Sequence, residues 1–178
     1  MATFKSSGKI KIDGTTYNIL SQGENGQVVV INNKEVAKIF ELSGSREEAA
    51  LMKSANKVNS LVVKLLRVDI TAEYSNELLV MERLYPLQYR AISVPEREKF
   101  FEVFLTQLKE LHAAGWAHGD IKRPDWVDSP WDNIILTQTE LRLIDTGTAV
   151  TSEHYNFKDW CERDIANAME FKKVFLKP

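Results

Sequence analysis

The sequence contains little of several residue types that would indicate a specialised class of protein. Among its 178 residues it has a single cysteine, Cys161, so it cannot form an internal disulfide, and we expect it to work in a reducing compartment. Its 23 basic and 25 acidic side chains give a formal net charge of −2, which provides no overall attraction to polyanions or to anionic lipid. We therefore expect neither nucleic acid nor a membrane as a partner.

Long hydrophobic runs are also missing. No apolar run approaches the roughly 20 residues that a helix needs to cross a bilayer, and the segment 1–5 lacks the apolar centre of a secretory signal. We expect a cytoplasmic protein, or one delivered into a host cell by a route that needs no signal. The apolar share of 44% is ordinary for a globular chain and is enough for one or two modest cores.

The first half of the sequence is rich in strand signals. Alternating and β-branched segments are separated by turn residues such as Asp13-Gly14, which favour a tight hairpin. A helix is predicted over 45–56, because Ser45 can cap it and acidic residues follow in its first turn. The predicted strands are 9–12, 15–20, 27–31, 35–40, 61–70 and 77–84.

The second half is mostly helical in pattern. After Pro95, apolar residues recur at helical spacing until Gly115, which is a typical helix end. Two short strands are predicted at 134–136 and 141–144, and a last helix at 161–175. A boundary near Tyr85 divides the chain into residues 1–84 and 85–178, so the sequence predicts an α+β protein.

Two groups of residues in the first half of the sequence are of a type that can bind phosphate. Gly23 and Gly26 lie between two predicted strands, where glycines allow a hairpin backbone to approach phosphate oxygens closely. Lys38 lies in an apolar strand and needs a partner if it is buried. Glu47 and Glu48 of the next helix both qualify, and the sequence does not choose between them.

A stronger signal follows the long predicted helix. Asp120 lies in His118-Gly119-Asp120, Asn133 precedes the strand 134–136, and Asp145 follows the strand 141–144. Each of these polar residues thus borders a short apolar segment, which fixes side chains firmly. An aspartate and an asparagine offer the hard oxygen ligands that Mg²⁺ prefers, and a second aspartate can orient an acceptor hydroxyl.

These motifs resemble those of the protein-kinase superfamily over nearly the whole chain. The resemblance implies a bilobal fold, with a β-rich N-lobe carrying one helix (residues 1–84) and a truncated helical C-lobe (residues 85–178). It also implies that the N-lobe binds ATP through the nucleotide loop, the lysine–glutamate pair and the hinge. The implied ATP-binding residues are Gly23, Gly26, Val28, Lys38, Glu48, Met81, Glu82 and Leu84.

For the C-lobe, the resemblance implies one role for each motif residue. Asp120 resembles the catalytic base and Lys122 the lysine that neutralises the transferring phosphoryl group. Asn133 and Asp145 resemble the two Mg²⁺ ligands. Asp164 resembles the buried aspartate that braces the catalytic loop.

The sequence departs from the family pattern in the catalytic loop. Gly119 stands where an arginine is usual, and Thr146 stands where a phenylalanine is usual. Asp120 and Asn133 are thirteen positions apart, where the family has five, so we interpret 123–130 as an inserted loop. Strict spacing would make Asp125 the metal ligand, but the strand signal at 134–136 favours Asn133.

Other segments of the family are short or missing. Eighteen residues separate Asp145 from Asp164, without an Ala-Pro-Glu motif, so we expect no activation segment. The first interpretation is a minimal Ser/Thr-type protein kinase that uses ATP and Mg²⁺ on a protein substrate, similar to small kinases of pathogenic bacteria or viruses. Two alternatives stay open: a small-molecule or atypical kinase, and a catalytically idle kinase-like binding module.

Overall fold

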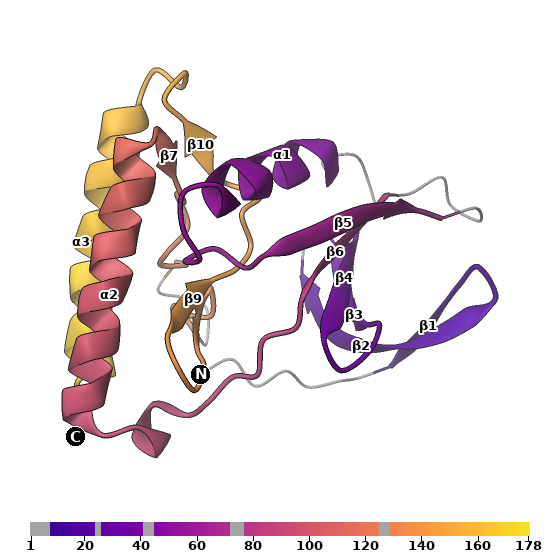
Figure 1. Cartoon of the computed structure of the whole chain (residues 1–178), viewed down its shortest axis with the longest axis horizontal. Helices are drawn as coiled ribbons and strands as arrows, with labels where there is room; N and C mark the ends of the chain where they lie inside the picture. The colour runs from indigo at the N-terminus through magenta and orange to yellow at the C-terminus, as the bar shows by residue number, and fades with distance from the viewer. Residues whose placement is uncertain (1–7, 24–25, 41–44, 72–76, 125–128) are drawn as a thin grey trace. The chain divides into compact units, whose positions relative to one another are not determined.

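The computed structural model describes residues 8–23, 26–40, 45–71, 77–124 and 129–178 (Figure 1). The chain forms two compact units. The first contains the described residues up to Ala50 and Lys64–Leu84, and the second contains Leu51–Val63 and Tyr85–Pro178. One division falls between Leu84 and Tyr85, whereas residues 51–63, which the sequence assigns to the N-lobe, group with the second unit.

The first unit is built on an antiparallel sheet of six strands. Its order is β1-β2-β3-β4-β6-β5, so only β5 and β6 leave the sequential arrangement. Asp13 and Gly14 both have positive φ, which makes the tight turn between β1 and β2 that the sequence predicts. The strands are β1 (Lys9–Ile12), β2 (Thr15–Gly23), β3 (Gly26–Val30), β4 (Glu35–Ile39), β5 (Leu65–Ile70) and β6 (Glu77–Glu82).

The two faces of this sheet carry different side chains. One face holds a hydrophobic cluster that includes Val29, Ala37 and Val80. The register pairs Val28 with Lys38 and Lys38 with Leu79, and directly opposed residues share a face. The other face therefore carries Val28, Lys38 and Leu79.

The second unit is mainly helical. Helices α2 (Val94–Ala113) and α3 (Phe157–Phe175) lie side by side, and the end of α1 (Ser45–Asn56) belongs to this unit. Short elements connect and flank these helices (Figure 1). They are η1 (Tyr89–Ala91), β7 (Trp116–Ala117), β8 (Ile134–Leu136), β9 (Leu141–Leu143) and β10 (Val150–Thr151).

The core of the second unit is aromatic. Phe101 and Phe104 of α2 and Phe171 and Phe175 of α3 are fully buried, and Phe171 stacks on Phe175 with ring centroids 5.0 Å apart. The guanidinium of the buried Arg97 donates to the backbone carbonyl of Phe175, so the end of α3 is fixed to the start of α2. This core holds α3 firmly, and α3 in turn contacts the His118-Gly119-Asp120 motif.

The predicted fold class is confirmed: the structure is α+β, with a β-rich part and a helical part. Among the described residues, α1 has the predicted bounds. Helix α3 begins at Phe157 instead of Cys161, and its cap residue Asn156 makes no side-chain capping bond. The two-residue strands β7 and β10 were not predicted, because they are too short for a periodic pattern.

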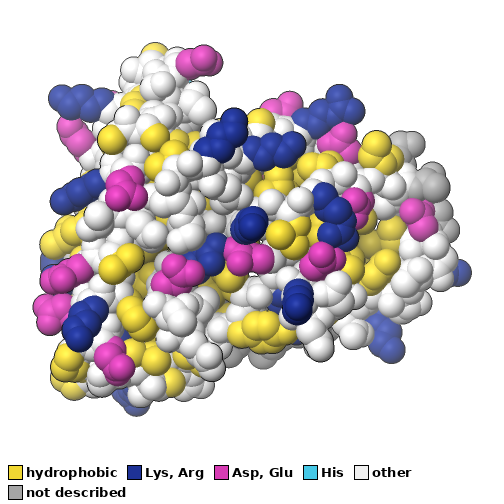
Figure 2. All heavy atoms as spheres, viewed as in Figure 1, with side chains coloured by type: hydrophobic (Ala, Val, Ile, Leu, Met, Phe, Trp, Pro, Cys, Tyr) yellow, Lys and Arg dark blue, Asp and Glu magenta, His cyan; other side chains and the backbone are white. Residues whose placement is uncertain are grey.

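The surface agrees with the near-neutral charge. On the face drawn in Figure 2, basic and acidic side chains of the described residues alternate without a continuous patch of one sign. No helix in the described part of the chain is long and apolar enough to cross a membrane.

Candidate functional site

Lys38 of β4 forms a buried ion pair with α1. Its Nζ atom lies 3.0 and 2.8 Å from the two carboxylate oxygens of Glu48, and the side chains are only 11% and 5% exposed. Glu47 is exposed. Of the two candidates that the sequence left open, Glu48 is therefore the partner of Lys38.

The strand register brings other predicted ATP-binding residues to the same face as Lys38. Val28 lies directly opposite Lys38. Met81 lies two residues beyond Leu79, which also opposes Lys38, so alternation places Met81 on that face. The Glu82 side chain accepts the Lys64 backbone N–H at 2.7 Å, and Leu84 follows the end of β6.

The glycine pair at the β2–β3 turn has a structural reason of its own. Gly23 and Gly26 are cross-strand partners. Gly26 has φ +144°, and a β-carbon there would collide with the backbone carbonyl oxygen of Ile39. The sheet itself thus requires a glycine at position 26, and its role toward phosphate stays a prediction.

Asp164 of α3 anchors the backbone of the His118-Gly119-Asp120 motif. Its carboxylate is fully buried and accepts the backbone N–H groups of His118 at 2.7 Å and Gly119 at 3.0 Å. His112 of α2 lies 3.3 Å from the same carboxylate. A buried carboxylate requires such donors, and these bonds provide the bracing that the sequence predicts for Asp164.

His118 links the motif to the segment that precedes Asp145. Its Nδ1 faces the backbone N–H of Asp120 at 3.2 Å, and its Nε2 faces the carbonyl oxygen of Ile144 at 2.9 Å. An N–H can only donate and a carbonyl can only accept. The partners therefore assign a neutral imidazole with its proton on Nε2, a role that the sequence did not reveal.

Asp120 and Asn133 are joined directly, although they lie thirteen positions apart. The Nδ2 group of Asn133 donates to the backbone carbonyl of Asp120 at 2.7 Å and to its Oδ2 atom at 3.1 Å. Asn133 is buried, and its Oδ1 atom accepts no hydrogen bond from the described residues. This orientation leaves the amide oxygen available as a ligand.

Asp145 has an unusual backbone and an exposed side chain. Its φ is +58°, in the left-handed region that few residues other than glycine, asparagine and aspartate adopt. Burial raises the pKa of Asp120, and the negative charge of Asp145 raises it further, against the lowering effects of the neighbouring His118 ring, the hydrogen bond from Asn133 and the charge of Arg123. Asp120 and Asp145 are thus near enough to influence each other's ionisation.

The donor set fits a magnesium ion better than a zinc ion. The described residues contain no group of three His, Cys, Asp or Glu side chains arranged to hold a metal, which structural zinc would require. An amide oxygen from Asn133 and a carboxylate from Asp145 are hard ligands. Magnesium is commonly held by one or two such groups together with the phosphates of a substrate.

Lys122 contacts helix α3. Its Nζ atom lies 2.9 Å from a carboxylate oxygen of Glu170 on α3 and 5.7 Å from the centre of the Trp131 ring. In this conformation Lys122 is therefore engaged with α3. Its role toward a phosphoryl group stays a prediction.

The inserted loop is closed at its base. The backbone N–H of Arg123 donates to the carbonyl of Pro130 at 2.8 Å, and the Arg123 guanidinium lies 3.1 Å from the Asp132 carboxylate. Asp125, the alternative to Asn133 as a metal ligand, lies outside the described residues. The closed base explains how an insertion can leave Asn133 beside Asp120.

Two further residues of α3 contact the motif, and neither of them was assigned a role in positioning it from the sequence. Arg163 donates to the carbonyl oxygen of Gly119 at 2.7 Å and stacks on Trp160, with its Cζ atom 3.8 Å from the ring centre. Together with Asp164 they have the spacing i, i+3, i+4 that marks one face of a helix. This spacing is the feature of the sequence that could have indicated that the three residues lie on one face of the helix.

No family model matches the sequence. A curated relative, the RIO-type serine/threonine-protein kinase Rio1 of Haloferax volcanii, is 30% identical over 131 residues. The match includes 71% of this chain and 40% of the length of that kinase. The chain therefore resembles a protein kinase in sequence, and it spans less than half of the relative that it matches.

Proposed function

We propose that the chain is an ATP- and Mg²⁺-dependent phosphotransferase, of the Ser/Thr protein-kinase type. The observation that carries this proposal is the pair of hydrogen bonds from Asn133 Nδ2 to Asp120. They direct the amide oxygen of Asn133 away from Asp120. They also hold the Asp120 carboxylate beside the Asn133 side chain. A ligand for a metal and a carboxylate for an acceptor are thereby fixed together on rigid backbone.

The proposed roles follow from the chemistry of each side chain. Asp120 accepts a hydrogen bond from the acceptor hydroxyl and takes its proton as the oxygen attacks the γ-phosphorus, while ADP leaves. When bound, Mg²⁺ supplies positive charge that offsets the charge on the phosphate oxygens, and Asn133 and Asp145 would hold it. Lys38, oriented by Glu48, would contact the α- and β-phosphates.

The raised pKa of Asp120 agrees with the role of a base. A carboxylate in a partly desolvated site binds a proton more readily than an exposed one, so it accepts the proton of a hydroxyl more readily as well. Burial is the largest cause of the raised pKa. The position of Asp120 in the fold is therefore the main reason for its raised pKa.

A protein acceptor is favoured over a small molecule by the name of the relative, which is a serine/threonine-protein kinase. The alternative of an idle binding module has one observation in its favour, because Lys122 pairs with Glu170. The presence of all four residues of the implied site argues against an idle module: Lys38, Asp120, Asn133 and Asp145.

Incubation with [γ-³²P]ATP, magnesium and a protein lysate separates these functions. We expect label in protein bands, on serine or threonine, that disappears with EDTA and with Asp145→Asn but persists with the exposed control Glu47→Gln. Label in a small metabolite would replace the protein acceptor with a small-molecule acceptor. ATP binding without any transfer would contradict the proposed activity.

A further inference from the structure

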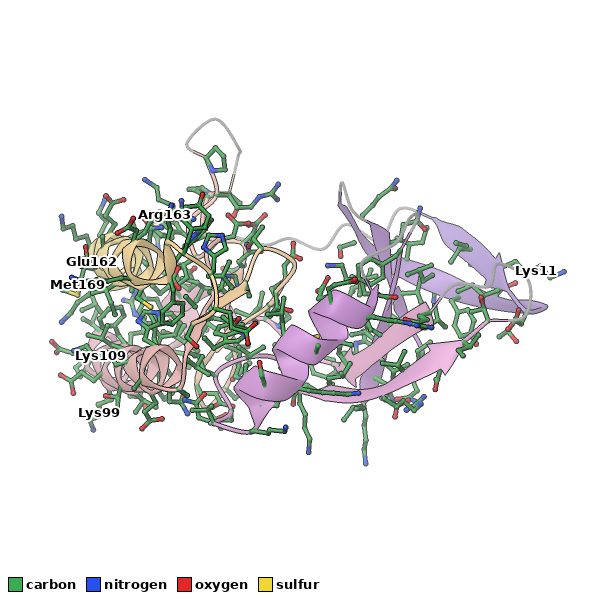
Figure 3. All side chains as sticks on the ribbon, turned by 90° about the horizontal axis from the view of Figure 1, so that it is seen from above. Lys11, Lys99, Lys109, Glu162, Arg163 and Met169 are labelled. Atoms are coloured by element: carbon green, nitrogen blue, oxygen red, sulfur yellow. The ribbon has the colours of Figure 1, made fainter. Side chains whose placement is uncertain are left out.

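In addition to Asp164 and His118, an arginine–tryptophan pair on α3, Arg163 and Trp160, contacts the His118-Gly119-Asp120 motif. Trp160, Arg163 and Asp164 project from one side of the helix, and all three contact the backbone at His118 or Gly119. Figure 3 shows Arg163 on a different side of α3 from Met169, and the exposed Arg163 side chain contacts Trp160 and Gly119 there. The pair thus faces the catalytic motif.

The contact of Arg163 is made to one particular peptide group. Its Nη2 atom donates to the carbonyl oxygen of Gly119 at 2.7 Å, and the N–H of the same peptide, which belongs to Asp120, donates to His118 Nδ1 at 3.2 Å. Both polar groups of the peptide that leads into Asp120 are therefore bonded. Rotation of this peptide would change the direction in which the Asp120 side chain projects.

Trp160 holds the guanidinium and also accounts for the glycine in the motif. The ring lies under Arg163 at 3.8 Å, a geometry that favours a planar cation. A β-carbon at Gly119 would lie 2.8 Å from Trp160 Cζ3 and 2.9 Å from the Thr148 carbonyl oxygen, and the φ of Gly119 is +80°. A side chain at position 119 would displace the ring and with it Arg163.

We infer that Arg163, supported by Trp160, is a positioning residue for Asp120. This inference rests on the proposed phosphotransferase function. The arginine acts from α3 on the backbone of the motif at Gly119, the position at which the sequence lacks the usual arginine. Because the guanidinium must stack and donate at once, lysine does not replace it.

The test compares Arg163→Ala and Arg163→Lys with Lys158→Ala, which removes an exposed positive charge from the same helix. We expect both Arg163 variants to lower kcat by about 10–100-fold, the scale of a small misplacement of a reacting group, with the KM for ATP and the unfolding temperature unchanged. Guanidinium ion at millimolar concentration should restore part of the kcat of Arg163→Ala. Lys158→Ala should behave as the wild type.

A second measurement does not depend on activity. Hydrogen exchange at the Asp120 amide should accelerate in Arg163→Ala, while exchange in the α2 core stays as slow as in the wild type. Wild-type kcat and exchange in that variant would overturn the inference, and so would a loss of kcat that follows global unfolding and resists guanidinium. If the wild type transfers no phosphate, the proposed function fails, and unchanged exchange at Asp120 would still refute the positioning role.

Discussion

Asn133 donates two hydrogen bonds to Asp120, one to its backbone carbonyl and one to its carboxylate, across an insertion in the chain. Both bonds need the N–H₂ group, which a carboxylate lacks. Asn133→Asp should therefore lose both bonds and place a second negative charge beside Asp120. We expect a loss of about 1–3 kcal/mol in the free energy of unfolding, the usual cost of leaving buried polar groups without partners.

Urea denaturation measures this loss, and Asn18→Asp, which adds the same charge at an exposed strand position, is the matched control. An Asn133→Asp protein that unfolds at the same urea concentration as the wild type would show that the two bonds contribute little to the site.

The ion pair between Lys38 and Glu48 supports a second prediction. Because both side chains are buried, Lys38→Met leaves a charged carboxylate without its partner and should cost about 3–5 kcal/mol in the free energy of unfolding. The double variant Lys38→Met with Glu48→Leu removes both charges and should recover most of that loss. Glu47→Gln should change nothing.

Denaturation of the wild type, Lys38→Met, Glu48→Leu and the double variant gives the coupling energy between positions 38 and 48. A double variant as unstable as the sum of its two single variants would mean that the pair is not coupled in the folded protein. Neither Lys38 variant should transfer phosphate efficiently, and we expect a decrease of about 10²–10³-fold.

Asp145 allows backbone strain to be separated from chemistry. Its φ of +58° is easily adopted by glycine and tolerated by asparagine, whereas alanine pays roughly 1–2 kcal/mol. Asp145→Gly and Asp145→Asn should therefore be more stable than Asp145→Ala, because only alanine is strained by this backbone conformation. All three should lose transfer activity, because the proposed charged metal ligand is gone. Equal stability of the alanine and glycine variants would argue against a left-handed backbone at this position.

The raised pKa of Asp120 gives a pH dependence with a defined sign. A carboxyl whose pKa is higher in the folded than in the unfolded protein contributes stability below its unfolded pKa, and this contribution is lost as the pH rises through the folded pKa. At neutral pH the ionised Asp120 is thus destabilising, so Asp120→Asn should raise the unfolding temperature at pH 7, and the gain should shrink in acid. A lower unfolding temperature of Asp120→Asn at pH 7 would contradict this.

The inserted loop can be shortened at its base. Because the Arg123 N–H and the Pro130 carbonyl are already hydrogen bonded, two or three glycines in place of residues 124–129 should join them without moving Asn133. We expect unchanged binding of an ATP analogue by titration and a slower reaction with the natural protein acceptor. Full activity toward that acceptor would show that the loop does not take part in its recognition.

Much of the architecture follows from local patterns in the sequence. The bounds of α1 were predicted from Ser45 and the acidic first turn, and the Asp13-Gly14 turn from its residue types. The family resemblance implied Glu48, but local patterns could not choose it over Glu47, because the choice depends on how α1 is rotated against the strand that carries Lys38. Local propensity does not determine such a rotation, which tertiary packing sets.

The site itself was predictable only in part. Asp120, Asn133 and Asp145 were selected because each borders a short apolar segment, and their roles in catalysis and metal binding stay predictions. The tautomer of His118 and the contact of Arg163 with Gly119 depend on backbone groups, and backbone groups have no signature in the sequence. The spacing of Trp160, Arg163 and Asp164 marks one helix face, but the partner of that face becomes visible only in the fold.

The most direct test of the account is a crystal structure with a non-hydrolysable ATP analogue and Mn²⁺, which anomalous scattering locates without ambiguity. The account predicts a metal ion bound by Asn133 Oδ1 and the Asp145 carboxylate, with the Asn133 amide nitrogen still donating to Asp120 and the Lys38 ammonium at the α- and β-phosphates. A metal ion bound by other side chains, with Asn133 turned away from it, would contradict the central claim.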